Sequence, residues 1–170
     1  MIEAAFASMG VTETSVWQVY PLSWQGIFTS ILCGAVVGAE RQIRGKPVGV
    51  RTAILITLGT YAFIVAALSI RSDMTDPSRI IGQVITGIGF LGAGVMLTRR
   101  GVVYGVTSAA TIWSMASIGV CIAIDEWLTA IKLSFLVVAI LVGIDLIETY
   151  ALKVSNGFAH KLRQWRDHDE

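Results

Sequence analysis

Charged side chains are scarce in this sequence. Only 15% of its 170 residues are Asp, Glu, Lys or Arg, whereas a soluble domain carries about 25%. Their placement is more informative, because residues 14–39, 52–70, 80–98 and 101–124 contain none. Each run can supply the roughly 20 residues that cross about 30 Å of hydrocarbon. The shortage of charge therefore excludes an ordinary soluble domain and indicates an integral membrane protein.

A fifth apolar segment, residues 127–152, is long enough to span a bilayer although it contains Lys132, Asp145 and Glu148. We therefore predict an all-α integral membrane protein, a bundle of about five transmembrane helices at residues 24–40, 52–70, 80–98, 106–124 and 127–150. The expected organisation is an extracytoplasmic segment at 1–23, a five-helix transmembrane domain at 24–152 and a basic cytoplasmic tail at 153–170. Apolar residues recur at helical spacing in that tail, which favours a short interfacial helix.

Cysteine and histidine are also rare. Cys33 and Cys121 fall inside predicted helices, where thiols packed as small apolar side chains are favoured over a disulfide or a metal pair. His160 and His168 both lie in the tail, and no nucleophile–base pair or phosphate-binding loop stands out. The sequence thus predicts no enzyme, no cofactor and no metal site. Its basic loops lack interleaved aromatic residues, which disfavours nucleic-acid binding.

The basic residues are distributed unevenly between the two ends of the predicted bundle. Ten of the 13 follow helices one, three or five, and only three lie at the other end. The positive-inside rule therefore places the amino terminus outside and the carboxyl terminus in the cytoplasm. The ten are Arg41, Arg44, Lys46, Arg51, Arg99, Arg100, Lys153, Lys161, Arg163 and Arg166; the three are Arg71, Arg79 and Lys132.

Charged residues in the first cytoplasmic loop and in helix five are expected at one membrane depth. Glu40 and Arg44 are four residues apart, the favourable order for a helical ion pair. Asp145 and Glu148 share a face of helix five, where two carboxylates either coordinate Mg²⁺ or pair with arginines. We favour pairing, and a positive-inside anchor explains some of the arginines on its own. The predicted ionic network comprises Glu40, Arg41, Arg44, Arg51, Asp145 and Glu148.

Helix three is rich in glycine at a spacing that literally reads GxGxxG. A dinucleotide site needs a preceding strand and an exposed helix start, which a charge-free membrane span does not provide. Small residues at this spacing instead favour close helix packing, within the chain or with another chain, and a GxxxG in helix one offers a facing groove. The packing glycines are Gly34 and Gly38 in helix one, and Gly87, Gly89, Gly92 and Gly94 in helix three.

Two further polar sets lie in the predicted spans. Arg79 and Gln83 share a face at the start of helix three. An intramembrane Gln needs a hydrogen-bond partner, so Gln83 either belongs to a functional site or holds two helices together. Thr107, Thr111 and Ser114 form a polar face on helix four. These hydroxyls either line a crevice or bond to helix backbones, and we favour the second interpretation.

Four segments together resemble the MgtC/SapB family of bacterial inner-membrane proteins. They are GAERQIRGKPVGVRT at Gly38–Thr52, PSRIIGQ at Pro77–Gln83, TGIGFLGAGV at Thr86–Val95 and GVTSAATIW at Gly105–Trp113. The resemblance covers about residues 35–125 and implies a small bundle of about five transmembrane helices. The motif positions that carry over are Glu40, Arg41, Arg44, Gly49, Arg51, Arg79, Gln83, Gly87, Gly89, Gly92, Gly94, Thr107 and Trp113.

The resemblance implies a non-enzymatic inner-membrane protein linked to magnesium homeostasis or stress adaptation, which regulates a membrane partner such as an ATPase or a transporter. We expect a short member, without the soluble domain that many members carry after the last helix. The alternative is a small transporter or channel for Mg²⁺ or another ion. The expected partners are the lipid bilayer and a membrane protein, with a homodimer as a further expectation.

Overall fold

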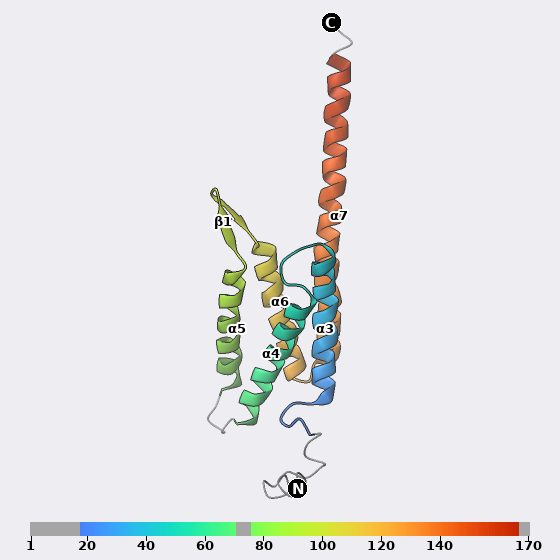
Figure 1. The fold of residues 1–170 in the computed structure, drawn as a ribbon. Helices are drawn as coiled ribbons and strands as arrows, with labels where there is room; N and C mark the ends of the chain where they lie inside the picture. Colours follow the sequence, from blue (N-terminus) through green and yellow to red (C-terminus); the bar gives the residue numbers. More distant parts are fainter. Residues whose placement is uncertain (1–17, 71–75, 167–170) are drawn as a thin grey trace, which may run out of the picture.

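Five helices run side by side in the described part of the molecule (Figure 1). The computed structural model describes residues 18–70 and 76–166, with side chains as far as residue 147. A short β-hairpin joins the third helix to the fourth, and the predicted all-α architecture is confirmed. The elements are α3 (Trp24–Ile43), α4 (Val50–Ser69), α5 (Pro77–Gly94), β1 (Leu97–Arg99), β2 (Val102–Tyr104), α6 (Val106–Ala123) and α7 (Trp127–Arg166).

Helix length and composition match a bilayer. Among the described residues, α4, α6 and the Trp127–Ile147 part of α7 are long and apolar enough to cross a membrane. The other two helices, α3 and α5, have 20 and 18 residues and lie beside them. At a rise of about 1.5 Å per residue, 20 residues extend about 30 Å, the thickness of the hydrocarbon core. The bundle is therefore a membrane domain.

The largest difference from the predicted helix boundaries is at the end of α7. The sequence predicted an end near residue 150 and a separate helix in the tail, but one helix continues to Arg166. No proline follows Pro77, and Gly157 alone does not interrupt the backbone. The side chain of Glu148, the tail side chains, residues 167–170 and the first 17 residues of the expected 1–23 segment lie outside the description.

The hairpin replaces the predicted end of helix three, which had been placed at residue 98. Helix α5 stops at Gly94, and Leu97 then pairs with Tyr104 in an antiparallel ladder. The turn residues Arg100 and Gly101 both have positive φ, as a tight two-residue hairpin turn requires. Gly105 also has positive φ where the hairpin meets α6, and a Cβ there would lie 2.3 Å from the Val95 carbonyl oxygen. The glycines are thus what allows this reversal.

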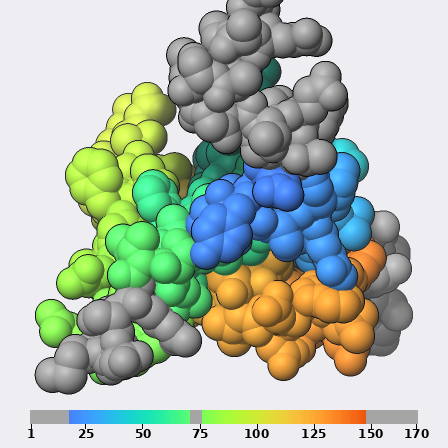
Figure 2. Space-filling view, turned by 90° about the horizontal axis from the view of Figure 1, so that it is seen from below, coloured from blue at the N-terminus to red at the C-terminus, as the bar shows by residue number. Residues whose placement is uncertain are grey.

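The core lies between α3, α4, α6 and α7, and α5 is peripheral. Helix α5 packs mainly on α6 and less extensively on α4. Figure 2 is seen from the end where α3 begins. It shows α3, α4 and α7 gathered together, and the green to yellow-green atoms of α5 and the hairpin at one edge. Among the described side chains of α5, only Ile88 and Gly92 are buried. Large buried side chains of the core are Val37, Ile64, Ile112, Met115, Ile118 and Ile122.

Candidate functional site

A cluster of charged side chains lies where α3 ends, beside α6 and α7. The last turn of α3 supplies Glu40 and Arg41, and the cap residue Arg44 follows. Glu40 is 8% exposed and Arg41 is 3% exposed. Burial of charged groups is costly unless they are paired, so each needs an opposite charge or a hydrogen bond nearby.

Arg44 forms ion pairs with carboxylates from two different helices. Its Nε lies 2.8 Å from Oε1 of Glu40, one turn earlier on α3. Its Nη1 donates to Oδ2 of Asp145 on α7. The Glu40 contact is an ion pair by distance, yet neither oxygen of Glu40 has a hydrogen bond within the described residues. Arg44 therefore ties α3 to α7 and is the cation that neutralises the buried carboxylate of Glu40.

Arg41 points to a different helix. Its Nη2 donates a hydrogen bond of 2.7 Å to Oγ of Ser108, in the first turn of α6, while its Nε has no hydrogen-bond partner among the described residues. Ser108 lies inside the GVTSAATIW segment, but the sequence analysis did not single it out. Thr107 and Thr111, beside it, belong to the predicted polar face, and no pattern in one sequence marks Ser108 as the hydroxyl that meets Arg41.

The predicted ionic network is only partly assembled. Glu40, Arg44 and Asp145 are brought together as expected, and Arg41 lies beside them but binds Ser108 instead. The expectation for Arg51 is not met, because its side chain is exposed and forms no ion pair with another described side chain. Arg51 is in the first turn of α4, a helix that packs on α3 and α6 and has no extensive contact with α7. For Glu148 only the backbone is described, so its part in the network stays a prediction.

The GxxxG of helix one packs against α4, not against the glycine-rich helix three. A Cβ on Gly34 would lie 2.7 Å from Cα of Ile54, and one on Gly38 would lie 2.6 Å from Cα of Val50. Neither position has room for a side chain. A third close approach was missed by the sequence analysis: Gly119 of α6 lies against Thr57 of α4. These glycines hold α3 and α6 close to α4.

Helix three, α5 in the structure, leaves most of its glycines without a close neighbour. A Cβ on Gly87, Gly89 or Gly94 would meet nothing within 4 Å, and only Gly92 touches α6, at Ala109. The expected contacts of Gly87, Gly89 and Gly94 with another helix are therefore not made within the described chain. Gly82, which the sequence analysis did not single out, is equally open.

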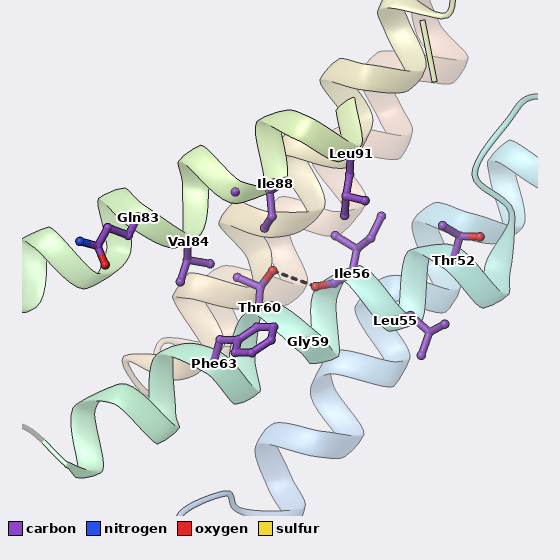
Figure 3. A pocket seen from close by; sticks show the side chains of 11 residues that line it. Thr52, Leu55, Ile56, Gly59, Thr60, Phe63, Gln83, Val84, Ile88 and Leu91 are labelled. Carbon is purple, nitrogen blue, oxygen red and sulfur yellow. Dashed lines mark hydrogen bonds between the residues drawn. The ribbon is translucent and has the colours of Figure 1, made fainter. Parts of the chain in front are cut away.

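A groove of about 590 Å³ runs between α4 and α5 (Figure 3). Its walls are mainly aliphatic and aromatic side chains, and Thr52, Thr60 and Gln83 are the polar residues along it. Thr60 is already satisfied, because its hydroxyl donates to the Ile56 carbonyl oxygen of its own helix at 2.8 Å. The groove exists because α5 leans on α6 and contacts α4 less extensively.

The polar residues at the start of α5 stay at its surface. Asp76 caps the helix, and the Ser78 N–H bond to its carboxylate, with a second bond from the Ser78 hydroxyl, lowers the pKa of Asp76. Arg79 and Gln83 are exposed and line a shallow depression with Gly82 and Thr86. Neither the side chain of Arg79 nor that of Gln83 forms a hydrogen bond or an ion pair with another described residue.

The hydroxyls of the predicted polar face bond to their own helix. Thr111 donates to the Thr107 carbonyl at 2.7 Å, and Ser114 donates to the Ala110 carbonyl at 3.0 Å. Thr107 itself is exposed. Within the described part of the chain, no group of three or more His, Cys, Asp or Glu residues could hold a metal ion.

Comparison with known proteins gives the family. Residues 27–150 match the model of the MgtC family. The chain is 46% identical over 103 residues to YhiD of Escherichia coli (strain K12), a proposed magnesium transporter; the match covers 56% of this chain and 47% of that relative. It is 37% identical over 111 residues to protein MgtC of Salmonella typhimurium (strain LT2), covering 65% of this chain and 47% of the relative.

The chain spans about half the length of these relatives. No solved structure matches it significantly. The matched region, residues 27–150, contains the charged cluster, the groove and the outward face of α5. Because the match covers most of the sequence, the chain belongs to the MgtC family.

Proposed function

We propose that this chain is a non-enzymatic protein of the bacterial inner membrane that serves magnesium homeostasis or stress adaptation by binding and regulating a membrane protein such as an ATPase or a transporter. Family membership and the name of the relative YhiD support the link to magnesium. The observation that carries the binding role is the outer face of α5. Gly82, Thr86, Gly89 and Ala93 recur there at spacings of four, three and four residues, and all are exposed.

This face has the composition of a helix contact rather than of a lipid-facing surface. Lipid tails offer no hydrophobic driving force between helices, so small residues that allow close backbone approach mark contact faces. The exposed face of α7 is different, since it presents large apolar side chains such as Phe135, Leu136 and Ile140. Next to the small face lies Gln83, exposed and without a described partner. An amide in hydrocarbon is stabilised when another helix supplies its hydrogen bonds.

The interior argues against the alternative of an ion pathway. Large apolar side chains fill the middle of the bundle, and five buried hydroxyls donate to backbone carbonyls of their own helices, while the hydroxyl of Ser108 accepts from Arg41. The described carboxylates lie near the ends of the apolar spans: Glu40 and Asp145 are paired with Arg44, Asp125 and Glu126 are exposed between α6 and α7, and Asp76 is exposed at the start of α5. The satisfied hydroxyls are those of Ser30, Thr57, Thr60, Thr111 and Ser134.

Two measurements test this proposal. The purified protein in liposomes that contain a magnesium-sensitive dye should give no faster Mg²⁺ entry than protein-free liposomes, and rapid entry would favour the transporter. A photo-cross-linking amino acid in place of Gly89 should then trap a membrane protein in cells, while the same group in place of Phe135 should not. A trapped second copy would identify the partner as a homodimer, and equal trapping from both positions would contradict a contact role for the α5 face.

A further inference from the structure

The groove between α4 and α5 has the shape and chemistry of a lipid site. We propose that it binds one acyl chain of an anionic phospholipid, with the lipid phosphate held at Arg51. The site uses the side of α5 that faces α4, not the outer face to which the partner is assigned. The proposal is therefore independent of the regulatory role.

Apolar walls and two glycines leave room for an acyl chain. Ile56 of α4 points toward Ile88 and Leu91 of α5, and Leu55, Phe63 and Val84 also line the groove (Figure 3). Gly59 and Gly87 line the same groove from opposite helices, and a Cβ on either would meet nothing within 4 Å. Unfilled space of this kind forfeits dispersion contacts, and a volume of about 590 Å³ falls within the range of small-molecule pockets. In a bilayer, the filler of matching chemistry is a hydrocarbon chain.

The length of the groove matches one leaflet. Its wall on α4 runs from Thr52, at the end of the bundle that carries the 44–49 loop, to Phe63. That separation of 11 residues corresponds to about 16 Å along a helix. Half of the roughly 30 Å hydrocarbon core is about 15 Å. The groove therefore reaches from one membrane surface to the bilayer midplane, as a single acyl chain does.

A cationic group marks the surface end of the groove. Arg51 is one turn before Leu55 on α4, so their side chains lie on the same face of that helix. Its guanidinium is exposed and has no described partner, unlike Arg41 and Arg44.

The start of α4 adds to this positive potential. Gly49 caps the helix without a side-chain hydrogen bond. Of the first three N–H groups of α4, only that of Val50 is bound by a described side chain, Oε1 of Gln42 at 3.2 Å. The positive end of the helix dipole thus lies beside Arg51 and favours a phosphate. An anionic headgroup above an apolar groove accounts for both features, and it explains why Arg51 stays out of the ionic cluster.

Native mass spectrometry of the whole 170-residue chain tests the site. The purified protein is delipidated and then incubated with equal amounts of dioleoylphosphatidylglycerol and dioleoylphosphatidylcholine. The wild type should retain one phosphatidylglycerol. Gly87→Leu should abolish retention because the new side chain fills the groove, and Gly59→Leu should do the same from the other wall. Gly89→Leu is the matched control, because it makes the same change on α5 outside the groove and should leave retention intact.

A charge substitution separates headgroup recognition from chain binding. Arg51→Gln should reduce the preference for phosphatidylglycerol about fivefold, the effect of one cation at an anionic surface. Arg99→Gln, which removes one charge from the hairpin at the same end of the bundle, should not. Equal lipid retention by Gly87→Leu and the wild type would overturn the proposal. A wild-type dimer that Gly87→Leu converts to a monomer would also overturn it, because the occupant would then be a second copy of the chain.

Discussion

At the scale of single residues, Arg44 holds a position that no neighbouring arginine can take. It lies one turn after Glu40 on the same helix and also meets Asp145 of α7. Arg41 and Arg51 carry the same charge at the same end of the bundle, but one binds Ser108 and the other is exposed. The placement of charges in the sequence predicts that these arginines lie at one membrane depth. The choice among three arginines depends on how each helix is rotated, which the spacing of charges does not determine.

We expect Arg44→Ala to lower the free energy of unfolding, because it leaves the buried carboxylate of Glu40 without its cation. The expected loss is about 1–3 kcal/mol, below the values for fully buried pairs since Asp145 is half exposed. Arg51→Ala should change the free energy by no more than about 0.5 kcal/mol, as for other surface substitutions. Unfolding of the detergent-solubilised protein, followed by circular dichroism, measures both.

Glu40→Gln provides the control for this prediction. In the Arg44→Ala background it should recover part of the lost stability, because it removes the unpaired charge. Equal losses for Arg44→Ala and Arg51→Ala would mean that the described pairing does not determine stability.

At the scale of elements, the sequence predicted the existence of the helices well and their contacts poorly. Runs without charge located four of the helices, and a long apolar segment with three charged residues located the fifth, since a bilayer sets both their length and their composition. The β-hairpin was missed because Leu97–Arg99 and Val102–Tyr104 are too short to show strand periodicity. The predicted partner of the GxxxG in helix one was also wrong, because small residues indicate that another helix packs closely but not which helix it is.

The two groups of glycines should therefore respond oppositely to the same change. Gly34→Ala places a methyl group 2.7 Å from Cα of Ile54, and this overpacking should destabilise the bundle by about 1–3 kcal/mol. Gly89→Ala meets no atom within 4 Å and should gain up to about 1 kcal/mol in helix propensity. Thermal unfolding of the two variants in the same detergent makes the comparison. A destabilised Gly89→Ala variant would show that the outer face of α5 is already in contact, as in a homodimer.

At the scale of the whole molecule, the fold gathers the basic segments at one end. The 44–49 loop, the hairpin with Arg99 and Arg100, and the carboxyl-terminal part of α7 all lie at the end opposite to the start of α3 (Figure 1). The sequence predicted this grouping because the segments that follow helices one, three and five lie on the same side of the membrane. The hairpin preserves it because it returns the chain to the same surface. The charged cluster and the mouth of the groove lie at this end too.

We expect this basic end to face the cytoplasm, because the positive-inside rule governs short loops of this kind. Single cysteines in place of Lys46 and Glu126, both exposed and at opposite ends of the bundle, report the orientation. The background carries Cys33→Ala and Cys121→Ala, which removes the two native thiols. A membrane-impermeant maleimide should label Glu126→Cys in intact cells, and Lys46→Cys only after the inner membrane is permeabilised. Labelling of Lys46→Cys in intact cells would reverse the orientation, and it would place the phosphate site at Arg51 in the outer leaflet of that membrane.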